Sequence, residues 1–428
     1  MKHSINSRKL SFWALIHFID IPNNPLLNFR IYINSWYRYS PESKYEISHL
    51  LEHCLFEKNK LFNSPIEFKT HVEKLWVSRN GFTDFFNNYY TINWEISKYR
   101  DIISLLINLV NWAELTEEIY NQQKEVVRNE ITANKNDFLR ELNVTLFWKM
   151  FEWNLNYKKR CELLDNIWFA DLKNFYKEYY VPQNYTFIIS WDIFWKEDDI
   201  LNILEEYYNS IEQGLEKKKD CEISNKYIHH CEFIEVQERS NYEFRLRYVI
   251  ETQDDYIRDI SRFFLNILMK GSWSRMQSKA REQGLIYSLL DCGEVGSKYI
   301  ALWFGEKLSE EKLIPLLKLL IDEIKDILSW NVTDEEIERA KGFFRWNVLR
   351  SYQTWWDISN YYVEKLILKK KWNDLDQYVN CIKDFNKAHL IEFSKYFDLN
   401  KWIFGIIWKN AEQKTEEIKK FLLEYSKN

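Results

Sequence analysis

Four residues of the chain, His49, Glu52, His53 and Glu130, have the types and spacing that metal-assisted hydrolysis needs. His49 and His53 stand four residues apart, so on a helix both imidazoles leave the same face and can bind one metal ion. Glu52 lies beside His53, where its carboxylate can act as a general base on a water molecule without binding the metal. A catalytic zinc also takes a third protein ligand, and Glu130, in a later helix-like stretch, is the candidate.

The motif and its spacing also carry a resemblance. His49-Leu50-Leu51-Glu52-His53 has the form H-x-x-E-H, the inverse of the H-E-x-x-H metalloprotease motif, and Glu130 follows well down the chain. The chain thereby resembles the pitrilysin or insulinase-type (M16) zinc metallopeptidases, in which a glutamate ligand follows the motif at the same distance as Glu130 follows His53. The resemblance runs over nearly all of the chain and is to the short, two-domain, bacterial processing-peptidase-like kind.

A second resemblance concerns the strand that would bind substrate. Asn80-Gly81-Phe82-Thr83 is similar to the N-A-x-T edge strand of that family, and the segment 32–39 takes the place of the strand before the zinc helix. The resemblance implies that Asn80, Phe82 and Thr83 bind a peptide substrate, which adds as an extra strand through its backbone.

The second half of the chain carries a further family element. Arg281-Glu282-Gln283-Gly284-Leu285-Ile286-Tyr287-Ser288 resembles R-E-x-x-G-L-x-Y-S, which implies that Arg281 and Tyr287 are catalytic residues supplied by the second domain. The sequence departs from the family pattern at two places, one in this element and one in the first half of the chain. The spacing from Arg281 to Tyr287 is one residue shorter than in the family, and Gln123 occupies the place of a second glutamate seven residues before Glu130.

The resemblance implies a zinc endopeptidase or oligopeptidase with one Zn²⁺ per chain, acting alone, as a homodimer, or as a heterodimer with an M16-like paralogue. Its third zinc ligand would be Glu130, and Glu52 would be the base. The alternative from another class is a non-catalytic scaffold or partner subunit of such a heterodimer. Members of that kind usually lose zinc residues, whereas this chain keeps His49, Glu52, His53 and Glu130.

Composition narrows the class of protein. The net charge of −5, with both signs interspersed and no long basic run, gives no indication of a nucleic-acid partner. No stretch of 18 or more apolar residues exists, so no membrane span is expected. The six cysteines form no C-x-x-C pair, which suits reduced thiols, and a cytoplasmic protein is the expectation.

The tryptophan and glycine contents are unusual. The chain has 19 Trp and 9 Gly, although average glycine usage of about 7% would give roughly 30. Trp36, Trp191, Trp273 and Trp330 stand where turns or the family likeness favour glycine. One hypothesis is that these codons are UGA in an organism that reads UGA as glycine. The other is a truly Trp-rich protein that binds carbohydrate by aromatic stacking, and the coding DNA would discriminate between them.

The chain divides into two similar halves. The window 179–191 can be laid on 396–408, and each window follows an amphipathic helix, forms a buried strand and leads into another helix. The offset between the windows is close to half the chain. We therefore predict an α+β fold with two homologous α+β domains, each a mixed sheet packed with helices, forming a clamshell. The predicted boundaries are 1–211 for the zinc-bearing domain, 212–220 for a charged linker, and 221–428 for the domain that completes the substrate chamber.

Local patterns predict the elements around these residues. The zinc pair falls on a helix over 42–58 and Glu130 on one over 116–141. The further predicted strands are 28–37, 77–83, 89–96, 232–236, 242–249, 285–292 and 298–304, besides the strand in each of the windows 179–191 and 396–408. The further predicted helices are 99–109, 197–208, 256–269, 309–329, 334–350 and 413–425.

Overall fold

The computed structural model describes residues 3–426 except 63, 76, 84–87, 150–154, 193–195, 210, 218–227, 239, 253, 288–290, 296–298 and 368–374. The chain forms two compact units, each a mixed sheet with helices, which confirms the predicted α+β class. Neither unit is continuous in sequence. The first consists of Met1–Lys135, Tyr157–Asp220 and Thr354–Ile367, and the second of Asn136–Asn156, Cys221–Gln353 and Leu368–Asn428.

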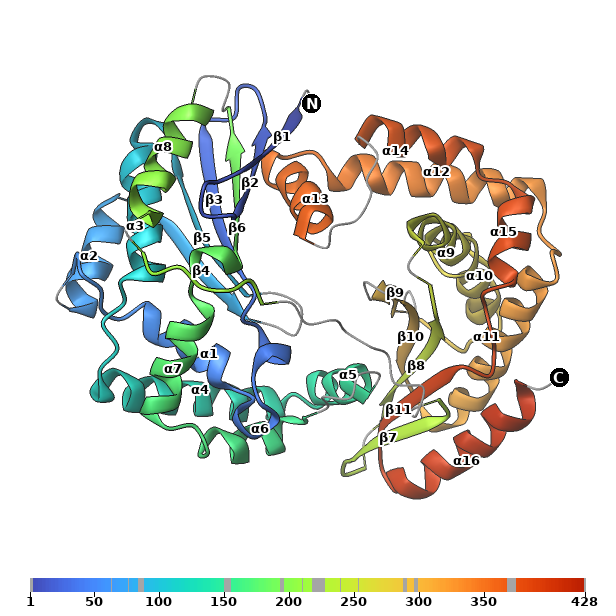
Figure 1. Cartoon of the computed structure of the whole chain (residues 1–428). Helices are drawn as coiled ribbons and strands as arrows, with labels where there is room; N and C mark the ends of the chain where they lie inside the picture. The colour runs from blue at the N-terminus through green and yellow to red at the C-terminus, as the bar shows by residue number, and fades with distance from the viewer. Residues whose placement is uncertain are drawn as a thin grey trace. The chain divides into compact units, whose positions relative to one another are not determined.

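The first unit is built on a six-stranded sheet of order β1-β2-β6-β3-β5-β4 (Figure 1). The pair β2 and β6 is parallel, and the other neighbours are antiparallel. Strands β3 and β6 are buried over nearly their whole length, as their long apolar runs predict. Its elements are β1 (Ser4–Lys9), β2 (Leu15–Asp20), β3 (Leu26–Ile33), α1 (Ile47–Leu55), α2 (Pro65–Leu75), β4 (Ser78–Thr83), β5 (Asn88–Glu95), α3 (Tyr99–Asn111), α4 (Glu117–Asn136), α6 (Tyr157–Leu164), α7 (Phe169–Tyr179), β6 (Tyr185–Trp191), α8 (Glu197–Tyr208) and α13 (Trp355–Ile367).

The second unit repeats this sheet with one strand fewer. Its order β7-β11-β8-β10-β9 matches β2-β6-β3-β5-β4, including the one parallel pair, here β7 with β11. Strand β11 begins and ends where the offset between the two sequence windows places the counterpart of β6. Its elements are α5 (Phe138–Lys149), β7 (His230–Glu235), β8 (Tyr242–Ile250), α9 (Asp255–Leu268), α10 (Arg275–Glu282), β9 (Asp291–Val295), β10 (Ile300–Leu308), α11 (Leu313–Leu328), α12 (Asp334–Ser351), α14 (Leu375–Cys381), α15 (Lys387–Ser394), β11 (Trp402–Trp408) and α16 (Ala411–Tyr425).

The two halves of the chain exchange equivalent helices. Helix α13, from the second half, packs on β2 and β6 of the first sheet, and α5, from the first half, packs on β7 and β11 of the second (Figure 1). The offset that relates β6 to β11 also relates the first residue of α5, Phe138, to the first residue of α13, Trp355. Each sheet is therefore completed by a helix encoded in the other half.

The polar contacts of the exchanged helices repeat as well. In the first unit, Arg30 on β3 donates from Nη2 to Oδ1 of Asn360 on α13 at 2.6 Å. In the second, Arg247 on β8 donates from Nη2 to Oδ1 of Asn143 on α5 at 3.2 Å. The same offset relates Arg30 to Arg247 and Asn143 to Asn360. This correspondence shows that the duplication includes the helix exchange.

Several predicted elements differ from the observed ones. The predicted strand 28–37 is shorter at its end, because β3 stops at Ile33 and Tyr37 starts a 3₁₀ turn. The zinc helix is shorter than 42–58, because residues 42–44 form a separate 3₁₀ turn before α1. The predicted helix 116–141 is two helices, since Asp137 accepts a hydrogen bond from the Arg140 amide at 3.0 Å and starts α5. Residues 285–287 of the predicted strand 285–292 are not in a strand, because the Leu285 amide still bonds to the Ala280 carbonyl at the end of α10, and the described strand β9 covers Asp291–Val295.

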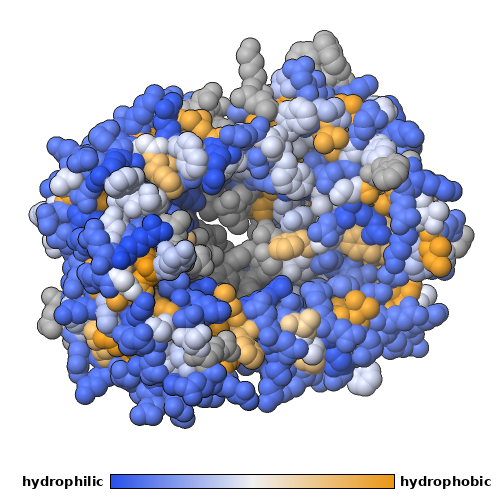
Figure 2. Space-filling view, turned by 180° about the vertical axis from the view of Figure 1, so that it is seen from behind, coloured by the Kyte–Doolittle hydropathy of each residue, from blue (hydrophilic) through white to orange (hydrophobic). Residues whose placement is uncertain are grey.

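Figure 2 shows hydrophilic residues over most of the face in view, with the hydrophobic residues in small separate groups. Among the described residues, no helix combines the length and the apolar character needed to cross a bilayer.

Candidate metal centre

Helix α1 brings His49 and His53 together. Its residues Leu50, Leu51 and Leu55 are fully buried and fix the helix against the first unit, so the rotation of the two imidazoles follows from this packing. The rings lie 4.9 Å apart between centroids in an edge-to-face arrangement. His49 is buried and His53 is partly exposed, which leaves the pair open on one side.

Helix α4 supplies the third group. The buried residues Val127 and Ile131 anchor it and turn Glu130 toward the histidines. The Nε2 atoms of His49 and His53 each lie 3.5 Å from Oε2 of Glu130. Zinc bonds of about 2.1 Å at a tetrahedral angle would separate two ligand atoms by about 3.4 Å. The three side chains thus have the donor types and the spacing that fit zinc.

Behind the histidines lies a carboxylate that the sequence analysis did not identify. Oε2 of the fully buried Glu46 lies 2.9 Å from Nδ1 of His49. Arg160 on α6 donates to both carboxylate oxygens of Glu46, from Nε at 2.5 Å and from Nη2 at 3.2 Å. Glu46 precedes His49 by three residues, a helical spacing that could have indicated the contact, whereas no sequence pattern marks Arg160.

These charges shift the pKa values of the site. Burial lowers the pKa of His49, but hydrogen bonds to Glu130 and Glu46 outweigh it and raise the pKa to about 10. The hydrogen bonds from His49 and His53 hold the pKa of Glu130 well below its usual range. Burial raises the pKa of Glu46, yet Arg160 and His49 together lower it to about 2. In the metal-free protein the centre is therefore a protonated histidine among carboxylates.

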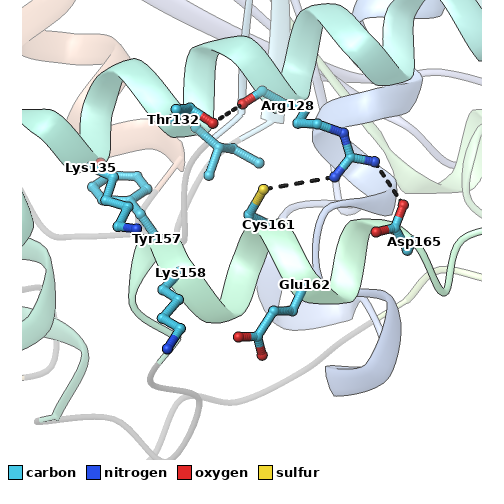
Figure 3. A pocket seen from close by; sticks show the side chains of 9 residues that line it. Arg128, Thr132, Lys135, Tyr157, Lys158, Cys161, Glu162 and Asp165 are labelled. Atoms are coloured by element: carbon cyan, nitrogen blue, oxygen red, sulfur yellow. Dashed lines mark hydrogen bonds and ion pairs between the residues drawn. The ribbon is translucent and has the colours of Figure 1, made fainter.

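One ion pair and one hydrogen bond, both from Arg128, link α4, which carries Glu130, to α6, which carries Arg160, and to the residue that follows it. Arg128 on α4 donates to Oδ1 of Asp165, just beyond α6, at 2.7 Å, and its Nη1 lies 3.8 Å from the sulfur of Cys161. Figure 3 shows these contacts at one end of a pocket of about 360 Å³ between the two helices. The contacts hold α4 and α6 in a fixed relation, which also fixes Glu130 relative to Arg160.

Glu52 is separate from the metal cluster. The ligand atoms of His49, His53 and Glu130 all lie within 4.8 Å of one another, and Glu52 is not part of this group. Its carboxylate lies against Gly81 of β4, where an added Cβ would come within 2.7 Å of Oε1. The absence of a side chain at Gly81 leaves room for the carboxylate beside the strand.

The predicted substrate strand is the edge of the first sheet. Asn80, Phe82 and Thr83 lie on β4, which pairs with β5 on one side and is the last strand in the order. Asn80 and Phe82 are exposed on one face of β4, whereas Thr83 is half-buried. The strand therefore has an unpaired edge in the described part of the chain, next to Glu52.

Arg281 and Tyr287 belong to the second unit. Arg281 lies in the last turn of α10 and donates from Nη2 to the Tyr287 carbonyl at 3.2 Å. Both side chains are exposed, that of Tyr287 almost completely. Gln123, the family's second glutamate position, lies on α4 two turns before Glu130 and is half-buried.

Family models match most of the chain. The model described as insulinase (peptidase family M16) matches residues 16–151, and that described as peptidase M16 inactive domain matches residues 166–343. The chain belongs to the M16 family. His49, Glu52, His53 and Glu130 all lie in the first of these regions, so the description "inactive" refers to a region without them.

Several solved structures share this fold. A protease from Helicobacter pylori matches with a TM-score of 0.81 at 14% identity, over 95% of this chain and 100% of that one. The peptidase M16 inactive domain from Pseudomonas fluorescens gives 0.80 at 14% identity, over 95% and 98%. The periplasmic protease PqqL from Escherichia coli gives 0.75 at 11% identity, over 96% of this chain and 46% of that one. A search of curated proteins gives no match.

Proposed function

We propose that the chain is a zinc-dependent peptidase that hydrolyses peptide bonds of oligopeptides or unfolded segments. One observation carries the proposal. Two imidazole nitrogens and one carboxylate oxygen, from His49, His53 and Glu130, converge at ligand spacing. This donor set is the one that hydrolytic zinc sites use, with a fourth position for water. One Zn²⁺ would bind per chain.

The residues around the centre have separate roles in this proposal. Bound zinc would supply an acidified water and a polarised carbonyl. Glu52, beside the ligands but outside their cluster, takes a proton from the attacking water and gives it to the leaving amine. His49, His53 and Glu130 hold their positions through the packing of α1 and α4.

Substrate would bind along β4. An extended peptide pairs with the free edge at Asn80, Phe82 and Thr83, which gives recognition through the backbone and tolerance of sequence. Arg281 and Tyr287 are proposed, from the family likeness, to bind the carbonyl oxygen or the tetrahedral intermediate. Their exposure on the second unit leaves both side chains available for such a contact.

The alternative is a non-catalytic or partner subunit of a heterodimeric M16-like peptidase. The match of residues 166–343 to the M16 inactive domain fits a two-part peptidase, whether the partner is a second domain or a second chain. A homodimer is the third arrangement. We propose the cytoplasm as the location, while the relative PqqL is a periplasmic protease.

Metal analysis and peptide hydrolysis together test the proposal. The purified chain should contain one zinc and cleave an unstructured fluorogenic peptide, and a chelator should abolish cleavage until zinc is restored. Glu52→Gln should keep its zinc while turnover falls by about a hundredfold or more, because only the proton carrier is lost. The control is Glu118→Gln, on the exposed first turn of α4. It should leave both the zinc content and the turnover unchanged.

The readouts separate the candidates. His49→Ala, His53→Ala or Glu130→Gln should release the metal, since each removes a ligand. Zinc binding without any hydrolysis would favour the partner-subunit alternative. Loss of metal from Glu52→Gln would place Glu52 among the ligands and refute its role as the base.

A further inference from the structure

Glu46 is a buried carboxylate that takes no direct part in the proposed reaction. Its side chain is fully buried at the start of α1, one turn before His49, and it contacts that histidine at Nδ1. We propose that Glu46, held by Arg160, is a positioning residue that fixes the ring of His49 with Nε2 toward the metal. The inference rests on the proposed zinc site.

The hydrogen bond decides the tautomer of His49. An imidazole whose Nδ1–H donates to a carboxylate carries its lone pair on Nε2, which is the atom that lies 3.5 Å from Glu130. A carboxylate in this place also orients the ring and raises its basicity as a ligand. Glu46 thus selects both the coordinating atom and the direction in which it points.

Arg160 makes the buried carboxylate tolerable. An ionised carboxylate without a partner is costly in the interior, and Arg160 contacts both of its oxygens. The guanidinium in turn lies over the rings of Tyr37, Tyr45 and Tyr157 at 4.9, 5.5 and 4.9 Å, and donates to the Tyr37 hydroxyl at 2.8 Å. This enclosure leaves Glu46 little freedom to turn away from His49.

Zinc affinity measured by competition with a chromogenic chelator tests the role. Glu46→Gln keeps an acceptor oxygen but loses the charge, and should weaken zinc binding by about tenfold. The double variant Glu46→Leu/Arg160→Met removes both buried charges together, a change that such pairs often tolerate. It should fold and bind zinc about a hundredfold more weakly. Glu162→Gln, which removes an exposed ion pair with Lys159 within α6, is the control and should keep the native affinity.

A second measurement separates positioning from stability. Nitrogen-15 spectra of the histidine rings should show a single Nδ1-protonated form of His49 in the zinc-loaded native chain and broadened signals in the double variant. Native zinc affinity in folded Glu46→Gln and in the double variant would overturn the inference and leave the proposed function intact. Failure of the native chain to bind zinc would instead refute the proposed function.

An independent observation concerns two tryptophans in left-handed backbone conformations. Trp330 follows the end of α11 with φ of 68°. Its backbone amide donates to the Ile327 carbonyl, and the backbone amide of Asn331 donates to the Asp326 carbonyl. This is the Schellman helix ending, whose left-handed position is usually glycine. The same ending follows α10, where the left-handed residue is Gly284, with φ of 66°.

Trp13 occupies a similar position in a hairpin. It has φ of 76° in the loop between β1 and β2, where its amide bonds to the Leu10 carbonyl and the Leu10 amide bonds to Ala14. Loops of this kind place glycine at the left-handed position. Trp13 is also 69% exposed, so no burial of the indole compensates for the conformation.

Other tryptophans have unsatisfied ring donors. The indole N–H groups of Trp191, Trp402 and Trp408 are buried without a hydrogen-bond partner in the described part of the chain. Buried tryptophans normally find such a partner. From the two left-handed positions and these donors we infer that the natural protein has glycine at Trp13 and Trp330, encoded by UGA codons that its organism reads as glycine.

Two experiments test this inference. UGA codons at positions 13 and 330 of the gene would support it, and UGG codons there would overturn it. Trp13→Gly and Trp330→Gly should each raise the melting temperature by about 2 °C or more. Trp346→Gly is the matched control. This exposed tryptophan lies inside α12, where glycine disfavours the helix, and the substitution should lower the melting temperature. A fall in all three variants would also count against the inference.

Discussion

At His49, zinc and a proton compete for the same site. In the metal-free protein its pKa lies at about 10, so at neutral pH the ring carries a proton that zinc must displace. We predict that zinc binding at pH 7.5 releases close to one proton, and that affinity rises about tenfold for each pH unit up to that pKa. Calorimetry in buffers of different protonation enthalpy measures the release. Binding without proton release would contradict the prediction.

His17 on β2 makes a separate prediction for acid stability. Burial lowers its pKa from 6.5 to about 4, although its Nδ1 lies 2.7 Å from the Ser7 hydroxyl. Between pH 4 and pH 6.5 the unfolded chain therefore binds more protons than the folded chain does. Stability is full above pH 6.5 and falls as pH drops toward 4, by up to roughly 3 kcal/mol from this group. His17→Gln should unfold with a weaker pH dependence in urea titrations at pH 7 and pH 4.5. An unchanged dependence would exclude His17 as the source.

Among the single residues of the site, the sequence could predict those that belong to a motif. The spacing of His49, His53 and Glu130 predicted three side chains that the structure brings together. Glu46 and Arg160 were not predicted. Their pairing joins positions far apart in the chain, and only the fold shows which buried arginine meets which carboxylate.

The exchanged helices α5 and α13 make a prediction about stability. Asn360→Leu removes the acceptor that Arg30, a buried residue, reaches on α13. The loss should lower the free energy of unfolding by about 1 to 3 kcal/mol. Asn143→Leu should act alike on Arg247 in the second unit. Asn121→Leu, exposed on α4, is the control for the substitution itself. Unchanged urea midpoints for Asn360→Leu and Asn143→Leu would show that the two pairs contribute little.

The repetition of elements in the two halves could be predicted from the sequence. The exchange of α5 and α13 between the two units could not. The half-chain offset is visible in the strands β6 and β11 because buried strands have long apolar runs. The amphipathic patterns of α5 and α13 do not say which sheet each helix covers. The break at Asp137 matters here, since it separates α5 from α4 and allows α5 to join the other unit.

At the scale of the whole molecule, the exchange of α5 and α13 predicts that the two halves of the chain bind to each other. If the chain is expressed as two pieces, 1–220 and 221–428, they should copurify, because each supplies a helix that completes the other's sheet. Piece 1–220 alone lacks α13 and should unfold at lower urea than the native chain. Size-exclusion chromatography and zinc content of the mixed pieces measure the outcome. Pieces that fold separately and never associate would contradict this prediction.

The late position of α13 in the chain also determines when, during synthesis, the first sheet can be covered. Strands β1 to β6 have all left the ribosome when residue 191 has, but the helix that packs on β2 and β6 begins only at Trp355. At about 5 to 20 residues per second, the first sheet waits roughly ten seconds or more with that face uncovered. The nascent chain therefore exposes apolar strand surface during translation, and cellular yield should depend on chaperones that bind the growing chain in this interval.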